Sequence, residues 1–259
     1  MSVYKSVPGF FLQDSPTADP ALIGPLPARF GLIDDSADRW ATFEKAVKAL
    51  NDDAEEGTAY KALWLGRHGE GWHNVAEANH WSKLNGDGEI TWGPDPELTP
   101  LGHTQARAAS ALFSTETSLP LPATLYASPM TRALQTLYDT FGHDGRKVYV
   151  MENAREHYGE HTCDKRLPLT LIKDKFPDVV FEDGMTEQDE LWTDEREAEA
   201  HVTERARAVL DTIFDMDDSW IISITSHSGL INGLLRAIGR ERYSLPTGGV
   251  LPVVVKRTT

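Results

Sequence analysis

The sequence predicts an α/β fold with a mostly parallel central sheet and helices on both faces. Two patterns predict it. Short β-branched apolar runs alternate with longer amphipathic segments, and several of the runs stop at a polar turn that leads into a helix. With 259 residues, 40% of them hydrophobic, the chain is long enough for one full core. We therefore expect a single domain over residues 1–259, with an irregular N-terminal arm (1–38) and loop insertions (79–96 and 163–194).

The individual elements follow from spacing and turn signals. Strands are predicted over residues 61–65, 125–127, 147–150, 221–225 and 250–256. Helices are predicted over residues 40–50, 100–113, 129–140, 195–214 and 230–238. Thr99 should cap the second helix, with Pro100 at its first position. Prolines and glycines without periodicity predict the irregular arm, and the insertion at 79–96 is expected to overhang the site.

Composition excludes several classes of protein. The net charge of −15 argues against nucleic acid or an anionic membrane as partner. No run approaches the length of a membrane span, and the N-terminus lacks a signal pattern. The single cysteine, Cys163, fits a reducing compartment, so we expect a cytoplasmic protein. An anionic substrate would need a local cationic pocket within this acidic surface.

The segment from Leu63 to Asn74 carries the strongest functional signal. Its apolar run ends abruptly at Arg67 and His68, followed by a glycine. An arginine fork matches phosphate oxygens in pairs, and a neutral imidazole is a nucleophile. Open α/β sheets bind their ligands at the carboxyl ends of strands, so this turn is a candidate site for attack on a tetrahedral anion.

Two further segments repeat the pattern. The strand at 221–225 leads to Ser226, His227 and Ser228 just before a helix, whose N-terminal N–H groups favour an anion. The strand at 125–127 leads to Ser128, a possible helix cap, and then to Arg132 in the first turn of a helix. Two histidines and two arginines thus lie at strand-to-helix transitions.

With these motifs the chain resembles the histidine phosphatase superfamily, in the branch related to phosphoglycerate mutase. The residues that carry the resemblance are Arg67-His68-Gly69-Glu70 with Asn74, Leu98-Thr99 with Gly102 and Gln105, Ser128-Pro129 with Arg132, Ala133 and Thr136, Arg155-Glu156, and Ser226-His227-Ser228-Gly229. Residues 7–11 and 161–166 are similar to a fungal subgroup of phosphomutase-like proteins.

The resemblance implies a mechanism without metal or other cofactor. His68 would attack phosphorus and carry the phosphoryl group, while an acceptor holds its other ring nitrogen. Arg67, Arg132 and His227 would clamp the phosphoryl oxygens, where transition-state charge develops. Asn74 and Ser228 would add hydrogen bonds to the phosphate. Glu156 is the candidate proton donor to the leaving group.

The chain departs from the family pattern in two places. Many relatives have serine where this chain has Gly71, so one hydroxyl donor to the phosphate is missing. The second departure concerns the acid: alignment on His157-Tyr158-Gly159 would put Arg155 in its place, whereas alignment on the Arg-Glu pair selects Glu156. We prefer Glu156 because the chemistry needs a proton donor, with Glu152 as the second choice.

Other side chains have competing interpretations. His157, His161 and Cys163 suggest zinc, but no fourth ligand has suitable spacing. Lys165 and Arg166 either bind a second anionic group of the substrate or are solvated. Further side chains are expected to be structural or solvated: His73, His80, His103, His143 and His201, and the packing residues Trp72, Trp81 and Trp92.

The prediction is a phosphomonoesterase that acts on a small phosphate ester. One alternative is a phosphomutase, which returns the phosphoryl group to another hydroxyl of a bound intermediate. Another is a repurposed member that binds a phosphorylated ligand without turnover. The presence of all four charged catalytic residues disfavours the last class. The segment after Glu156 lacks the mutase pattern and carries acidic residues, which favours hydrolysis.

Overall fold

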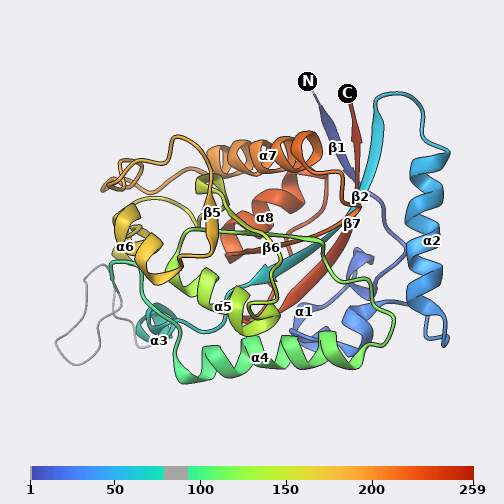
Figure 1. Cartoon of the computed structure of the whole chain (residues 1–259), viewed down its shortest axis with the longest axis horizontal. Helices are drawn as coiled ribbons and strands as arrows, with labels where there is room; N and C mark the ends of the chain where they lie inside the picture. The colour runs from blue at the N-terminus through green and yellow to red at the C-terminus, as the bar shows by residue number, and fades with distance from the viewer. Residues whose placement is uncertain (1, 79–92) are drawn as a thin grey trace.

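The computed structural model describes residues 2–78 and 93–259. A seven-stranded sheet with the order β1-β7-β2-β6-β3-β4-β5 runs through this described part (Figure 1). Its strands are β1 (Val3–Ser6), β2 (Thr58–Arg67), β3 (Thr124–Ala127), β4 (Val148–Val150), β5 (Val179–Phe181), β6 (Ile221–Ser226) and β7 (Val250–Thr258). The five strands β2-β6-β3-β4-β5, in their order in the sheet, are parallel to their neighbours. Strand β7 is antiparallel to both β1 and β2. The predicted mostly parallel sheet is confirmed.

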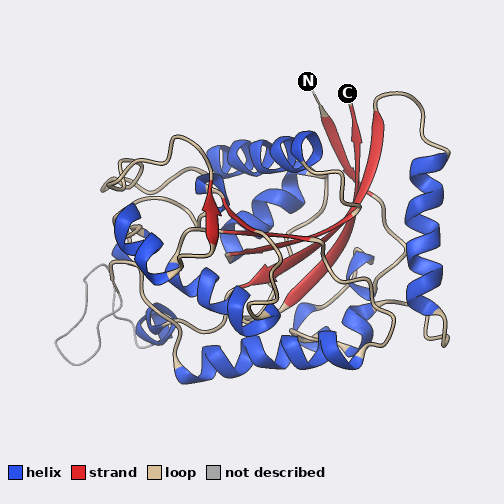
Figure 2. Cartoon of the chain, viewed as in Figure 1, coloured by secondary structure: helices blue, strands red, loops and turns tan. Residues whose placement is uncertain are grey.

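Helices cover both faces of this sheet (Figure 2). They are α1 (Pro20–Ile23), α2 (Arg39–Asp52), α3 (Trp72–Ala78), α4 (Pro100–Thr115), α5 (Thr131–Phe141), α6 (Leu169–Lys175), α7 (Glu199–Met216) and α8 (Ser228–Ala237). Short 3-10 turns occur at 12–14, 28–31, 152–154 and 162–164. The predicted cap is confirmed, because the Thr99 side chain accepts a hydrogen bond from the Gly102 N–H.

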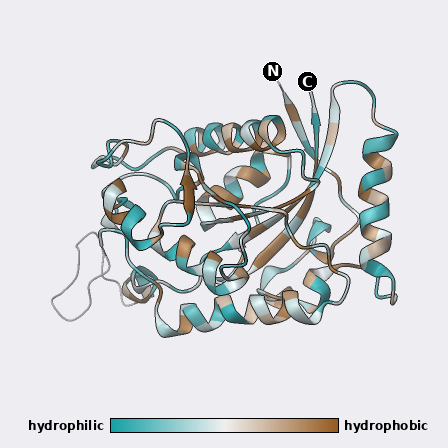
Figure 3. Ribbon diagram, in the orientation of Figure 1, coloured by the Kyte–Doolittle hydropathy of each residue, from teal (hydrophilic) through white to brown (hydrophobic). Residues whose placement is uncertain are grey.

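Strand alternation divides the core between the two faces. Leu63 and Leu65 of β2 pack with α7 and α8, whereas Trp64 packs with the aromatic side chains of α2 and α4. Hydrophobic colour concentrates on the sheet in Figure 3, while α2 alternates between hydrophilic and hydrophobic. In the described part of the chain, no helix is long and apolar enough to cross a membrane.

Two sequence predictions about the periphery need correction. The arm at 1–38 is not wholly irregular, because β1 joins the sheet edge and Tyr4 packs on Phe214. The insertion at 163–194 contains α6 and the edge strand β5. Both strands are only three or four residues long, too short for a periodic signal. Of the insertion at 79–96, residues 79–92 lie outside the described residues, and so do His80, Trp81 and Trp92.

Two helices begin later than predicted. The helix expected from 195 begins at Glu199, because the Glu197 N–H bonds to the Tyr158 carbonyl and the Glu197 carboxylate pairs with Arg205. The helix expected from 129 begins at Thr131. Ser128 is not its N-cap residue, although its hydroxyl accepts a hydrogen bond from the Met130 N–H.

Candidate active site

The candidate site lies where the central parallel strands end. Arg67 of β2 is paired in register with Ser226 of β6, and Ala127 of β3 with Thr225. The residues that follow therefore lie together at the carboxyl ends of these strands: His68 after β2, His227 after β6 and Ser128 after β3. The ring centroids of His68 and His227 lie 5.0 Å apart. The structure thus brings together the two histidines that the motifs singled out.

His68 is held in a defined tautomer. Its imidazole is 2% exposed, and Nδ1 lies 2.6 Å from the Gly69 carbonyl oxygen. A carbonyl only accepts, so Nδ1 carries the proton and donates it, which leaves a lone pair on Nε2. Burial lowers the pKa of His68 well below its ordinary value, and Arg132 and Arg67 lower it further. The ring is therefore neutral at physiological pH, with Nε2 free to act as a nucleophile.

Both predicted arginines lie beside His68 and are oriented by the protein. Arg132 is fully buried and donates from Nη1 to the Cys163 carbonyl at 2.8 Å and from Nη2 to Asp164 Oδ1 at 2.9 Å. Arg67 donates from Nη1 to the Leu245 carbonyl at 2.8 Å. Asp164 was not recognised in the sequence, because its partner lies 32 residues away in the chain.

His227 precedes α8, and its Nε2 lies 2.8 Å from the Ser128 hydroxyl. Ser128 therefore orients a second imidazole. Ser228 is the first residue of α8 and is partly buried, so the N–H groups of the helix N-terminus lie at this edge of the sheet. A direct hydrogen bond from Ser228 to phosphate stays a prediction.

Four buried nitrogen atoms near His68 have no hydrogen-bond partner among the described residues. They are Arg67 Nε, Arg132 Nε, His73 Nδ1 and His227 Nδ1, and we call them the nitrogen cluster. Buried donors without a partner are costly to a protein. An anion with several oxygens, such as a phosphoryl group, would satisfy them together.

Glu156 reaches the same site from the loop after β4. Its Oε1 accepts hydrogen bonds from the His157 N–H at 2.9 Å and from His157 Nδ1 at 3.0 Å, and Oε2 accepts from the Gly229 N–H at 3.1 Å. Burial alone would raise the pKa of Glu156, but these hydrogen bonds outweigh it and lower the pKa below its ordinary value. Glu156 raises the pKa of His157 in return. The pair therefore shares one proton, held mainly on His157.

Gly229 makes this approach possible. A Cβ atom at position 229 would lie 1.8 Å from Glu156 Oε1, far inside any allowed contact. Gly229, the glycine that follows His227 and Ser228, is thus needed to leave room for the Glu156 carboxylate, which comes from the loop after β4.

Arg155 and Glu152, the two other residues at or near the position of the acid, belong to a network of buried ion pairs. Arg155 is buried and pairs with both oxygens of Asp189, at 2.9 and 2.5 Å, and with Glu152 at 2.7 Å. Arg166, only 3% exposed, also contacts Glu152 at 3.2 Å. Glu152 is therefore committed to two arginines, and Arg166 is neither solvated nor open to a substrate. Lys165 lies over the Trp192 ring, 4.7 Å from its centroid.

This network predicts a stability effect. Asp189→Ala should lower the free energy of unfolding by about 3–5 kcal/mol, because it leaves the buried Arg155 guanidinium without its main partner. Chemical denaturation of the wild type and the variant measures this. Asp194→Ala, at an exposed position of the same segment, is the matched control and should change little. A loss below about 1 kcal/mol for Asp189→Ala would show that the pair is not structurally important.

The structure also gives the positions of Asn74 and of the three side chains that suggested zinc. Asn74 lies in α3, and its amide oxygen accepts from the Gly71 N–H at 3.0 Å; its bond to phosphate stays a prediction. In the described ranges, no group of three or more His, Cys, Asp or Glu side chains is arranged to hold a metal ion. His157, His161 and Cys163 thus do not form the cluster that a zinc site requires.

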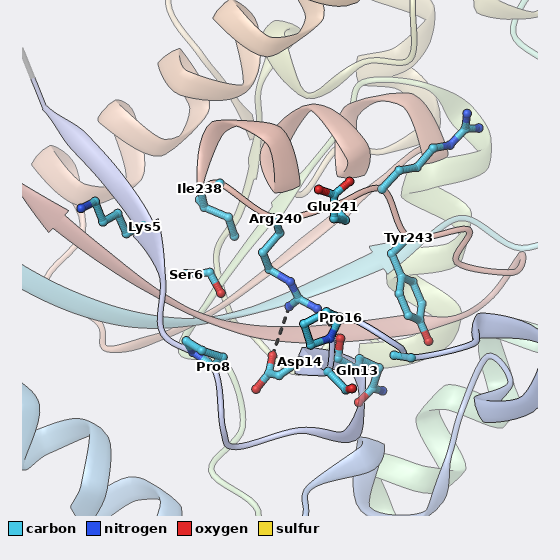
Figure 4. A pocket seen from close by; sticks show the side chains of 14 residues that line it. Lys5, Ser6, Pro8, Gln13, Asp14, Pro16, Ile238, Arg240, Glu241 and Tyr243 are labelled. Atoms are coloured by element: carbon cyan, nitrogen blue, oxygen red, sulfur yellow. Dashed lines mark hydrogen bonds and ion pairs between the residues drawn. The ribbon is translucent and has the colours of Figure 1, made fainter.

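A cavity of about 460 Å³ lies elsewhere, between the N-terminal arm and the segment after α8 (Figure 4). Lys5, Tyr243, Asp14 and Arg240 line it, and the last two form an ion pair of 3.1 Å. None of the predicted site residues lines this cavity.

Comparison with known proteins agrees with the site. The family model described as histidine phosphatase superfamily (branch 1) matches residues 63–247. A "Probable phosphoglycerate mutase" of Arthroderma benhamiae is 39% identical over 99% of this chain and 85% of its own length. "Phosphomutase-like protein 3" of Candida albicans is 37% identical over 75% of this chain and 65% of its own, slightly less than two thirds. The fungal resemblance is confirmed.

Among solved structures, a mycobacterial glucosyl-3-phosphoglycerate phosphatase aligns with a TM-score of 0.44 and 22% identity. The alignment covers 69% of this chain and 79% of that one. A similarity of this degree carries no information on substrate.

Proposed function

The chain belongs to the histidine phosphatase superfamily, and on that premise we propose that it is a metal-independent phosphomonoesterase acting on a small phosphorylated metabolite through a phosphohistidine intermediate. The tautomer of His68 carries this proposal. Its Nδ1–H is committed to the Gly69 carbonyl, so the lone pair of a neutral Nε2 is left for phosphorus. We further propose that the protein works in the cytoplasm, with neither nucleic acid nor membrane as partner.

The reaction proceeds in two transfers. In the first, the lone pair of His68 Nε2 forms a bond to phosphorus while the ester P–O bond breaks, and the Glu156–His157 pair supplies the proton that the leaving alkoxide takes up. In the second, water attacks the phosphohistidine, the P–N bond breaks, and the pair receives the proton of the water. Arg67 and Arg132 offset the charge on the phosphoryl oxygens. His227, whose pKa is lowered well below its ordinary value by burial, contributes a hydrogen bond as a neutral imidazole.

A phosphomutase is the second candidate, and the name of the Arthroderma benhamiae relative, "Probable phosphoglycerate mutase", favours it. A mutase must anchor a second anionic group while its intermediate reorients. Arg166, one cation considered for that purpose, is buried against Glu152. Lys165 is engaged with Trp192. These commitments support water as the acceptor of the phosphoryl group.

The two candidates differ in their products. With 3-phosphoglycerate as substrate, we expect release of inorganic phosphate without 2-phosphoglycerate, or no reaction beside brisk hydrolysis of another ester in a panel. Phosphorus NMR follows substrate, isomer and free phosphate in one sample, and enzyme inactivated by His68→Ala is the control for spontaneous hydrolysis. Isomerisation that outruns phosphate release would establish the mutase instead.

A further inference from the structure

His73 lies in the middle of the candidate site, although the sequence assigned it no role. It is the second residue of α3, its side chain is 6% exposed, and its ring centroid lies 5.3 Å from that of His68. Its Nδ1 is the member of the nitrogen cluster that the mechanism above does not use. A buried imidazole so close to the nucleophile is placed to contact whatever the nucleophile attacks.

The residue at position 71 explains how this imidazole fits. A Cβ atom on Gly71 would lie 2.7 Å from His73 Nδ1 and 2.8 Å from His73 Cε1. Both distances are shorter than van der Waals contact, so the ring occupies the space that any side chain at position 71 would need. A serine at 71 and this placement of His73 are therefore mutually exclusive.

We propose that His73 is a phosphoryl-binding residue, in which Nδ1–H donates a hydrogen bond to a phosphoryl oxygen of the substrate and of the phosphohistidine on His68. It takes over the position of the hydroxyl that is missing at Gly71. This inference rests on the proposed function and adds a ligand contact to the same site.

The surroundings favour a neutral donor at this point. Burial lowers the pKa of His73 well below its ordinary value, and Arg132, His68 and Arg67 lower it further. A neutral imidazole has one N–H, and it binds an oxygen without adding another positive charge beside two arginines. His73 thereby supplies the kind of neutral hydrogen bond that a serine hydroxyl would have supplied.

The test moves the hydrogen-bond donor from position 73 to position 71. The variants are His73→Ala, His73→Gln, Gly71→Ser and the double variant Gly71→Ser/His73→Ala, with His143→Ala, an exposed histidine, as matched control. Orthovanadate affinity by titration calorimetry and kcat/KM for p-nitrophenyl phosphate are measured on the full chain, and thermal unfolding shows which variants are folded.

We expect His73→Ala to weaken vanadate binding and kcat/KM by about 10- to 100-fold, the range of a hydrogen bond to a charged group. His73→Gln, which keeps an N–H donor, should lose less, and the double variant should recover most of the loss. Gly71→Ser alone should be impaired, because its side chain collides with His73.

Other outcomes overturn the inference. Equal vanadate affinity of wild type and folded His73→Ala, or a double variant no better than His73→Ala, would leave His73 a packing residue. Wild type that binds no vanadate would also refute it. Wild type that binds vanadate but hydrolyses no ester would instead refute the proposed function, while the vanadate affinities would still decide the role of His73.

Discussion

Replacing His68 with alanine should lower kcat/KM for phosphate esters by about 10³-fold or more and abolish the acid-trapped phosphoenzyme. The reason is geometric. His68 Nε2 has a lone pair at neutral pH because the Gly69 carbonyl holds the other nitrogen, and Arg67 and Arg132 are close enough to influence its charge. Phosphoryl transfer depends mainly on such positioning and electrostatics. A water molecule in the space left by the imidazole would not be a nucleophile held in this position.

The measurement has two parts. Steady-state turnover is compared for wild type, His68→Ala and His68→Asn, and protein quenched in acid during turnover is analysed for phosphate on His68 by mass spectrometry. His143→Ala is the control and should behave as wild type. Near-wild-type turnover of folded His68→Ala would refute the mechanism, and phosphate found on another histidine would move the nucleophile there.

The central fold could be predicted because its signals are local. The runs that became β2, β3 and β6 are apolar, bounded by turn residues, and end in polar residues that the parallel sheet collects at one edge. His68, His227, Arg67 and Arg132 could therefore be placed together from the sequence. The short strands β1 and β5 could not, because a strand of three or four residues has no measurable period.

The partners of the site residues could not be predicted, because they depend on contacts distant in the chain. Asp164 reaches Arg132 across 32 residues, and Asp189 reaches Arg155 across 34. The sequence predicts only a loop insertion at 163–194, yet this segment supplies both carboxylates. Only the packed structure shows that Arg155 is structural. His73, by contrast, has a local signal, because it lies close to both His68 and Gly71 in the chain.

The ionisation of Glu156 is the least expected property of the site. A general acid must hold a proton, whereas hydrogen bonds from His157 and Gly229 stabilise Glu156 as a carboxylate. The proton is nevertheless close, because His157 Nδ1 lies 3.0 Å from Glu156 Oε1 and the pKa of His157 is raised. Glu156 is close enough to His68 to affect its pKa, so a phosphoryl group bound at His68 adds negative charge near this carboxyl. Where that charge raises the pKa of Glu156 more than the pKa of His157, it favours proton transfer from Nδ1 to Oε1. His157 then acts as the proton reservoir and Glu156 as the donor.

This arrangement predicts that Glu156→Gln separates two kinds of substrate. Hydrolysis of alkyl phosphates should fall by about 10²- to 10⁴-fold, the contribution of general acid catalysis, because an alkoxide leaves only with a proton. p-Nitrophenyl phosphate should lose much less, because its leaving group departs unprotonated. Glutamine keeps the size of the side chain, so no packing defect is expected, and thermal unfolding of the variant checks this. Glu204→Gln, at an exposed position of α7, controls for loss of charge.

Equal losses on both substrates in a folded Glu156→Gln variant would assign Glu156 to binding. Glu152 is already bound to Arg155 and Arg166, so His157 itself would then be the next candidate for the proton donor. Replacement of His157 should in that case lower the hydrolysis of alkyl phosphates much more than that of p-nitrophenyl phosphate.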